Sequence, residues 1–300
     1  MEFSGSEGHG AILHKPVMVK EVLQFLISNR NGIYLDATAG TGGHSLRILE
    51  ALGEGGRLIS LDRDHKALEV VRARCDDSRQ IVMKSSFSRL GEALDGIDVN
   101  ALDGALFDLG LSMMQLKDMH RGFSFDSPHR LDMRMDTEQP LDAYRVVNEY
   151  PEQALEELIK RYGEEHSARK IARTIIHRRA KRPITTCLEL AQIISSVVGF
   201  RGRIHPATKT FQAIRIEVNN EVTELRAGLK EAINRLRKGG RLCVVSYHSI
   251  EDREVKGLFR EANRAGLVSI VTKKAVRPSL DEVSDNKASR SAKLRVCERL

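Results

Sequence analysis

The chain has 300 residues, of which 41% are hydrophobic and 30% are charged. This hydrophobic share is ample for a packed core and excludes a disordered chain, and no apolar run is long enough to span a membrane. The formal net charge of +7 favours an anionic partner, first of all a nucleic acid.

Cysteine usage and the N-terminal composition both indicate a reducing compartment. The cysteines are far apart and include no Cys-x-x-Cys pair, so the sequence predicts neither a zinc site nor a disulfide framework. They are Cys75, Cys187, Cys243 and Cys297, and the third lies in an apolar run that predicts a core position. The N-terminus has no apolar segment typical of a signal peptide, so we expect a cytoplasmic protein.

The first part of the chain predicts a strand, a glycine-rich turn and a helix. A helix is expected over residues 19–27, and a strand over 33–36 ends in Asp36. The glycines of the turn are Gly40, Gly42 and Gly43, and the helix after them is expected to stop at Gly53. Glycines let the backbone approach a ligand, and the first N–H groups of a helix attract an electron-rich partner. The pattern indicates a nucleotide-like ligand.

Two features of this segment favour S-adenosylmethionine over a dinucleotide. A dinucleotide fingerprint would require a third glycine where Ser45 stands. Asp36 would repel a pyrophosphate, whereas S-adenosylmethionine carries an ammonium and a sulfonium and no phosphate. Asp36 and Gly40 are therefore candidate cofactor residues. The alternative is an ordinary strand–turn–helix unit of an α/β domain.

The next predicted strand ends in a second acid. This strand covers residues 57–62, and Asp62 follows the glycine-rich turn by about twenty residues. Folds of this kind place an acid against a pair of ribose hydroxyls at that distance. A solvated cap at the end of the strand is the alternative.

Two more candidates follow later strands. Phe87 comes after a short strand over 81–83, and we expect it either to cover an adenine or to lie in the core. A strand over 104–109 carries Asp108 near its carboxyl end. Ligands of open α/β sheets bind at that end of the strands, so Asp108 is a candidate for the chemistry.

Strand patterns stop near Lys117 and return at residues 241–246. The sequence therefore predicts an α/β fold in which residues 1–116 and 215–300 form the sheet domain. Residues 117–214 would form an inserted helical domain that recognises the substrate.

The predicted insertion is strongly basic. From residue 160 to residue 215 the chain has thirteen lysines and arginines and three acids. A solvated helix face is the usual fate of such a run, but a surplus of this size favours contact with a phosphate backbone. The tail over 286–299 adds five cations, which we expect on the same side.

Ten strings, in order along the chain, carry a resemblance to a known family. They are 14–18 (HKPVM), 42–45 (GGHS), 62–64 (DRD), 108–110 (DLG), 121–125 (RGFSF), 131–136 (LDMRMD), 162–165 (YGEE), 205–213 (HPATKTFQA), 246–253 (SYHSIEDR) and 289–295 (SRSAKLR). Together they resemble the bacterial ribosomal RNA small subunit methyltransferase H family, the MraW-type enzymes. The likeness covers nearly the whole chain.

The resemblance implies a class I S-adenosylmethionine-dependent methyltransferase with a Rossmann-like sheet and an inserted helical domain. It implies methylation of the exocyclic N4 amine of one cytidine at the decoding centre of 16S ribosomal RNA, which is the activity of an rRNA (cytosine-N4-)-methyltransferase. The implied partner is small-subunit ribosomal RNA or the assembled subunit. The family's cofactor contacts carry over onto Gly42, Gly43, His44, Asp62, Phe87, Asp108 and Gln115.

Candidate catalytic and substrate residues complete the prediction. Asp108 could accept a hydrogen bond from the target amine or hold the cofactor. The candidate substrate contacts are Arg134, Lys209, Arg215 and His248. Each of these cations could instead form an internal salt bridge, and His248 could cap a helix. No His/Cys cluster indicates a metal. The chain also departs from the family, with Met113 and Met114 after Ser112 and with Tyr247 in the late motif.

Two other functions fit parts of the sequence. A non-catalytic RNA-binding ribosome assembly factor could keep a vestigial nucleotide fold, but the intact Gly42, Asp62 and Asp108 argue against decay. A nicotinamide-dependent oxidoreductase is disfavoured by the missing third glycine and by the basic insertion. The sequence fits either a monomer or a homodimer.

Overall fold

The computed structural model describes residues 15–200 and 204–300 and has a seven-stranded sheet at its centre. The strands are β1 (Ile33–Asp36), β2 (Arg57–Asp62), β3 (Gln80–Lys84), β4 (Leu102–Asp108), β5 (Leu236–Ser246), β6 (Val268–Ile270) and β7 (Lys293–Arg299). Their order is β3-β2-β1-β4-β5-β7-β6. Strands β1 to β5 are parallel, and β7 runs antiparallel to both β5 and β6.

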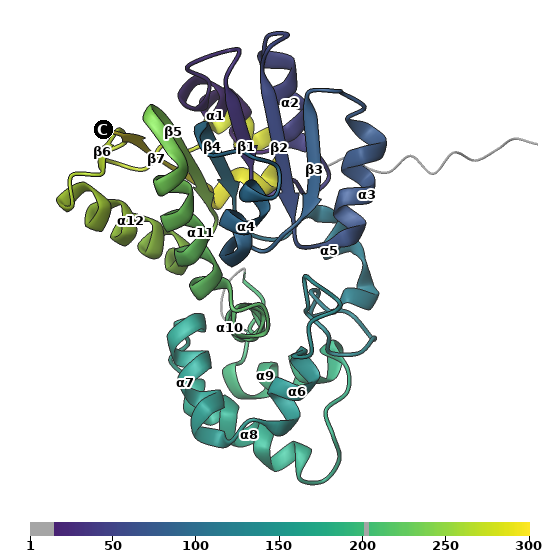
Figure 1. Cartoon of the computed structure of the whole chain (residues 1–300). Helices are drawn as coiled ribbons and strands as arrows, with labels where there is room; N and C mark the ends of the chain where they lie inside the picture. The colour runs from purple at the N-terminus through teal and green to yellow at the C-terminus, as the bar shows by residue number, and fades with distance from the viewer. Residues whose placement is uncertain (1–14, 201–203) are drawn as a thin grey trace, which may run out of the picture.

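Both faces of the sheet are apolar, because side chains alternate along each strand and helices cover both sides. On one face Tyr34 packs with helices α1 (Val19–Leu26) and α2 (Gly43–Ala51). On the other face Leu35 packs with α4 (Leu90–Asp95), α11 (Glu221–Arg235) and α12 (Ser249–Arg264). Helix α3 (His65–Arg74) follows β2 (Figure 1). These layers confirm the predicted Rossmann-like α/β sheet.

The predicted strand–turn–helix is confirmed, whereas one later strand is longer than expected. Helix α2 begins at Gly43 and ends at Ala51, just before the predicted stop. Strand β5 begins at Leu236 rather than at residue 241. Leu236 pairs with Leu102 before an irregularity in the register, and Gly239 there has φ +78°. The Lys-Gly-Gly string at 238–240 resembles a turn in the sequence, but it is an irregular part of the strand.

The segment between β4 and α11 is helical, as predicted. Its helices are α5 (Met113–Lys117), α6 (Ala143–Glu149), α7 (Glu152–Gly163), α8 (Ala168–Arg179), α9 (Cys187–Val198) and α10 (Thr208–Val218). Residues between 123 and 218 form a hydrophobic cluster of their own. In Figure 1 helices α6 to α9 lie below the sheet, and α10 lies between them and α11. No helix in the described part of the chain has the length and apolar character needed to cross a membrane.

The four cysteines are buried and free, as their spacing predicted. Cys243 lies in the core, within β5. Burial raises the pKa of the Cys187 and Cys243 thiols to about 12. Burial also raises the pKa of Cys75 and of Cys297 above the ordinary thiol value. All four side chains therefore stay protonated near neutral pH.

Candidate active site

A cavity of about 410 Å³ lies at the carboxyl ends of β1, β2, β4 and β5, where ligands bind in open α/β sheets. The segment between β4 and α11 also contributes to its wall, through Met135, Arg215 and Ile216. The predicted site residues that line the cavity are Gly40, Gly43, His44, Asp62, Phe87, Asp108, Gln115, Arg215 and His248. Those that do not are Asp36, Gly42, Arg134 and Lys209.

The glycine-rich turn has two left-handed residues, Gly40 at φ +52° and Gly42 at φ +80°. Gly40 faces the cavity, and its N–H donates to Asp62 Oδ2 at 2.8 Å. Gly42 faces the other way, since a Cβ added there would come within 3.3 Å of Cys75 Sγ. Gly42 therefore allows the left-handed turn on the side that packs against Cys75, while Gly40 exposes its backbone to a ligand in the cavity.

Asp62 ends β2 and joins this strand to the turn. Its Oδ2 accepts the Gly40 N–H, and its Oδ1 accepts the Asp64 N–H at 2.9 Å. Burial raises the pKa of the Asp62 carboxyl to about 6, although the two backbone N–H groups partly oppose that rise. A half-buried carboxylate in this position has lone pairs left for hydroxyl groups of a ligand.

Asp36 lies beneath the turn and not on the cavity wall. It is fully buried, and it accepts hydrogen bonds from Ser45 Oγ at 2.7 Å and from the Thr38 N–H at 3.1 Å. Burial raises its pKa, with His44 acting in the opposite direction. Side chains alternate along a strand, so Asp36 points to the same face as Tyr34, toward α2. The carboxylate thus supports the turn from the core side.

Asp108 is held by two side chains. Its Oδ1 accepts from the Tyr247 hydroxyl at 2.7 Å, and its Oδ2 lies 3.3 Å from His44 Nδ1. His44 Nε2 faces the Val17 carbonyl oxygen at 2.9 Å. Burial alone would lower the pKa of His44, but the Asp108 carboxylate outweighs burial, and the net pKa is raised. Burial followed by the charge of Asp108 keeps the pKa of Tyr247 well above its ordinary value, so the hydroxyl remains a donor.

Phe87 and Gln115 form further parts of the wall. Phe87 contacts Phe107 edge to face, with 5.1 Å between the ring centroids, so it is a core aromatic as well as a cavity residue. Gln115 is buried, and its Nε2 donates to Asp64 Oδ2 at 2.9 Å. The same carboxylate binds Arg121 Nη1 at 3.0 Å. These contacts fix the orientation of the Gln115 amide.

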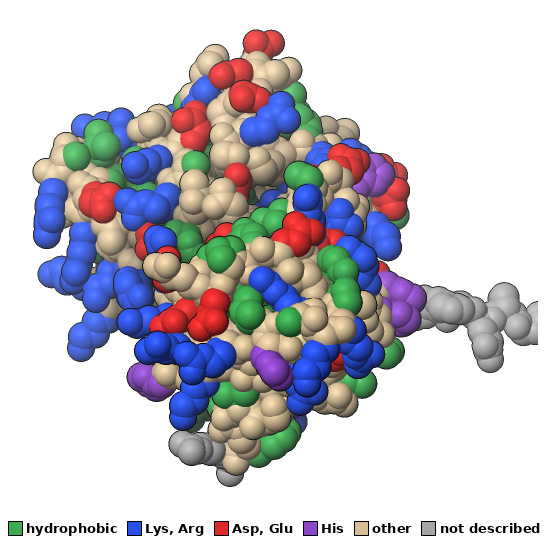
Figure 2. All heavy atoms as spheres, turned by 90° about the horizontal axis from the view of Figure 1, so that it is seen from below, with side chains coloured by type: hydrophobic (Ala, Val, Ile, Leu, Met, Phe, Trp, Pro, Cys, Tyr) green, Lys and Arg blue, Asp and Glu red, His purple; other side chains and the backbone are tan. Residues whose placement is uncertain are grey.

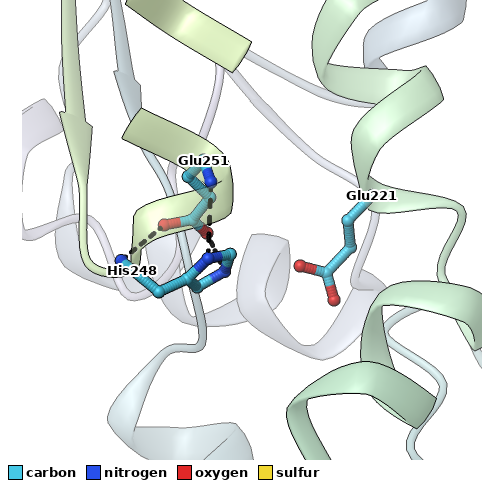
Figure 3. A group of neighbouring side chains, drawn as sticks. All are labelled: Glu221, His248 and Glu251. Atoms are coloured by element: carbon cyan, nitrogen blue, oxygen red, sulfur yellow. Dashed lines mark hydrogen bonds and ion pairs between the residues drawn. The ribbon is translucent and has the colours of Figure 1, made fainter. Parts of the chain in front are cut away.

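Arg215 and His248 reach the cavity from the opposite side. Figure 3 shows Glu221 pointing toward His248 and Glu251 across a gap, and ligand atoms of these three residues lie within 4.8 Å of one another. The Arg215 guanidinium reaches the same group. Its Nη2 is 2.8 Å from Glu221 Oε2, 3.3 Å from His248 Nε2 and 4.0 Å from Glu251 Oε1. Arg215 thus supplies the positive charge for a cluster that could otherwise hold a metal ion.

His248 is the N-cap of α12, which is one of the two interpretations of its sequence position. Its Nδ1 accepts the Glu251 N–H at 3.4 Å, and its Nε2 lies 3.0 Å from Glu251 Oε1 and 3.3 Å from Arg215 Nη2. The ring lines the cavity and caps the helix at once.

Arg134 and Lys209 have partners within the inserted segment. Arg134 binds both oxygens of Asp132, at 3.0 and 2.8 Å, and also donates to backbone carbonyls. Lys209 Nζ donates to the Glu164 carbonyl at 3.0 Å. Of the two interpretations open for Arg134, the structure shows the internal salt bridge.

Two residues around the cavity did not emerge as sites from the sequence. Glu251 did emerge, because with His248 it lies after the fifth predicted strand of the sheet domain, either in a substrate loop or at the capped start of a helix, and an acid three residues after a cap is the spacing of a capping box. Glu221 had no local signal, since its pairing with Arg215 crosses the break between two helices. Tyr247 stood out only as a departure from the family, and its contact with Asp108 spans 139 positions.

Comparison with known proteins shows the family of this chain. Residues 11–300 match the MraW methylase family. The ribosomal RNA small subunit methyltransferase H of Caldicellulosiruptor bescii is 45% identical, over 96% of this chain and 99% of its own length. The protein of the same name from Persephonella marina is 47% identical, also over 96% and 99%. A third, from Coprothermobacter proteolyticus, is 44% identical over 95% of both chains. The chain therefore belongs to the MraW methylase family, as its motifs indicated.

Proposed function

We propose that this protein uses S-adenosylmethionine to methylate small-subunit ribosomal RNA, and that its target is the exocyclic N4 amine of a cytidine at the decoding centre. The observation that carries the proposal is the cavity at the strand ends, where Gly40, Asp62 and Asp108 face one space in a chain of the MraW methylase family. Curated relatives of this chain are named ribosomal RNA small subunit methyltransferases. The N4 amine and the decoding centre are what the motif resemblance implies.

The cavity fits a nucleoside that carries a cationic amino-acid end. Its volume of about 410 Å³ is within the range of small-molecule sites. The strand ends present the carboxylates of Asp62 and Asp108, which would repel a pyrophosphate but attract an ammonium or a sulfonium. Gly40 leaves the backbone open at the turn. When bound, S-adenosylmethionine would supply a methyl group already activated by the sulfonium.

Five wall residues would hold this cofactor. Asp62 would accept hydrogen bonds from the ribose hydroxyls, and Phe87 would cover the adenine. Gln115, whose amide is held by Asp64, would contact the cofactor as well. Gly43 and His44, at the start of α2, would border its amino-acid end. Asp36 and Gly42 act indirectly, because they shape the turn without lining the cavity.

Asp108 is the proposed catalytic residue. An ionised carboxylate has about four lone-pair sites, and Tyr247 and His44 use one on each oxygen. The remaining sites can accept an N–H of the target amine and orient its nitrogen. Because the methyl group would arrive already activated, positioning by these residues would supply most of the rate. Arg215 and His248 line the side from which a base would enter.

The decisive experiment identifies the methylated nucleoside. The purified protein is incubated with S-adenosylmethionine and either naked 16S ribosomal RNA or assembled small subunits lacking the modification. We expect N4-methylcytidine in at least one substrate. A different methylated nucleoside would contradict the assigned target. Absence of both methyl transfer and calorimetric cofactor binding would favour the non-catalytic assembly factor.

Replacing Asp108 tests its role. We predict that Asp108→Ala lowers the rate or the cofactor affinity by about ten- to a hundredfold, because a hydrogen bond to a charged group contributes about 1.5–3 kcal/mol. Methyl-transfer kinetics and calorimetry separate the two effects. Asp126→Ala is the matched control, since Asp126 is exposed and does not line the cavity. Wild-type values for both variants would refute the assignment.

A further inference from the structure

A run of exposed positive charge lies in the C-terminal part of the chain, outside the inserted segment. Eight exposed cations, which we call the C-terminal basic surface, fall between residues 256 and 290. They are Lys256, Arg260, Arg264, Lys273, Lys274, Arg277, Lys287 and Arg290. Within the described residues, none of the eight lies within ion-pair distance of an acid. The first three belong to α12, and the last two belong to the 3-10 helix η3 (Lys287–Ser291).

The acids of the same stretch neutralise this surface only in part. There are four between residues 256 and 290, and three of them have other partners. Glu261 pairs with Arg226 at 3.5 Å. Glu282 accepts the Met18 N–H at 2.6 Å, and Asp285 pairs with Lys15 at 3.7 Å. The surplus of positive charge is therefore left to the solvent or to a partner.

The cations on α12 form one row. Lys256, Arg260 and Arg264 follow each other at steps of four residues, so their side chains lie on the same face of the helix. Like charges at this spacing destabilise a helix. A row that works against helix stability favours a role in binding an extended anion.

The elements that carry this surface also contribute to the cavity wall. The first turns of α12 contribute Ile250, Glu251 and Glu254 to the cavity wall, and η3 contributes Ala288, which lies next to Lys287 in the chain. Figure 2 shows lysines and arginines gathered along the left edge, the side on which α12 and β6 lie in Figure 1. A strand that delivers one nucleotide to the cavity would pass this edge.

The cations of the inserted segment are less well placed. Arg179 donates to the carbonyls of Val147 and Tyr150, and Arg215 is largely buried in its pair with Glu221. Arg201 and Arg203, counted in the sequence, lie outside the described residues. Exposed cations such as Arg169 and Arg178 are on α8, which Figure 1 shows at the end of the molecule far from the sheet.

We propose that the RNA next to the target nucleotide runs from the cavity mouth across the C-terminal basic surface, with its phosphates on these lysines and arginines. The proposal rests on the proposed function. Phosphate contacts supply most sequence-independent affinity for nucleic acids, and an enzyme that acts on a base must hold the flanking backbone while the base leaves its stack. The inserted helices then close the cavity from the other side.

A matched pair of triple variants tests this path. The test variant is Lys256→Gln/Arg260→Gln/Arg264→Gln, and the control is Arg169→Gln/Lys170→Gln/Arg178→Gln on α8, which removes the same charge. The readouts are the affinity for small-subunit RNA between about 50 and 200 mM salt, and the affinity for S-adenosylmethionine. Each lost phosphate contact lowers the salt slope by about 0.7 for a single strand. We expect a slope lower by about 2 and at least about tenfold weaker RNA binding in the test variant.

The control should change RNA binding less than about threefold, and cofactor affinity should be unchanged in both variants. An equal or larger loss in the control would overturn the path, and so would wild-type RNA affinity in the test variant. A loss confined to assembled subunits would assign the surface to a ribosomal protein instead. If the α12 variant does not fold, Lys287→Gln/Arg290→Gln on η3 tests the same path. Absence of methylation by the wild-type protein would be a failure of the proposed function and not of this path.

Discussion

At the scale of single residues, His44 lies next to Asp108 and balances the charge of that carboxylate inside the protein. Its Nδ1 faces Asp108 and its Nε2 faces the Val17 carbonyl, and both of these neighbours are acceptors. A neutral imidazole can donate to only one of them. The raised pKa of His44 agrees with a ring that carries both protons. The buried pair of His44 and Asp108 then has no net charge of its own.

Removing the Tyr247 hydroxyl should weaken catalysis without unfolding the protein. Tyr247→Phe loses the 2.7 Å hydrogen bond to Asp108, and we expect kcat/KM to fall about tenfold. Tyr150→Phe is a matched control, because that hydroxyl donates to Glu217 at 3.0 Å, away from the cavity. Steady-state methyl-transfer kinetics measure both variants. An equal loss in the two would show that the effect is not specific to Asp108.

Cofactor affinity should depend on pH through Asp62, whose pKa is raised to about 6. Only the ionised carboxylate accepts both ribose hydroxyls, so affinity should fall as pH drops below about 6, by about tenfold at pH 5. The folded carboxyl binds its proton more tightly than the unfolded one. Its contribution to stability is therefore greatest at low pH and is lost as pH rises from about 4 to 6. Calorimetry from about pH 5 to 8 measures the affinity, and Asp62→Asn should abolish its pH dependence.

At the scale of elements, the junction between α10 and α11 determines how the inserted helices meet the sheet. Arg215 near the end of α10 binds Glu221 at the start of α11 through two hydrogen bonds of 2.8 Å. Between them Asn219 is buried, and its side chain bonds to the backbone of Met133 and Met135 at 2.7 Å. One short stretch thus ties two helices and a loop of the insertion together.

Breaking this junction should cost stability. Arg215→Ala leaves the largely buried Glu221 without its partner, and we expect a loss of about 3–5 kcal/mol in the free energy of unfolding. The double variant Arg215→Ala/Glu221→Ala should recover part of that loss, because no unpaired carboxylate remains at position 221. Denaturant titrations of the wild type and three variants complete the cycle. Strict additivity would contradict direct coupling.

Helices and strands were predictable where neighbouring residues in the sequence carry the signal. The apolar run, the glycines and the helical spacing around Asp36 predicted β1, the turn and α2. The alternation of side chains along β1 also predicts the direction of the Asp36 side chain, because residues 34 and 36 point to the same face of the sheet. The beginning of β5 was hidden, because Gly239 and Gly240 are typical of a turn and only pairing with β4 makes this stretch a strand.

At the scale of the whole molecule, the site is built from segments that the sequence separates widely. Asp64 pairs with Arg121, and Asp108 accepts a hydrogen bond from Tyr247, only because folding brings these distant residues together. Periodicity and spacing do not predict such long-range contacts. Only the cavity residues at strand ends could therefore be predicted from the sequence. Lys84 on β3 also pairs with Asp136 and Glu138 of the inserted segment. These contacts link the sheet to the insertion around the cavity.

The protonated, buried thiols have a practical consequence for measuring this arrangement. Maleimide and iodoacetamide reagents attack exposed thiolates, and the native cysteines offer none at neutral pH. One new cysteine on α8 and another on α12 would therefore accept fluorophores without removal of any natural cysteine. Energy transfer between the two dyes would then report the distance from the helical insertion to the sheet in solution, before and after RNA is added.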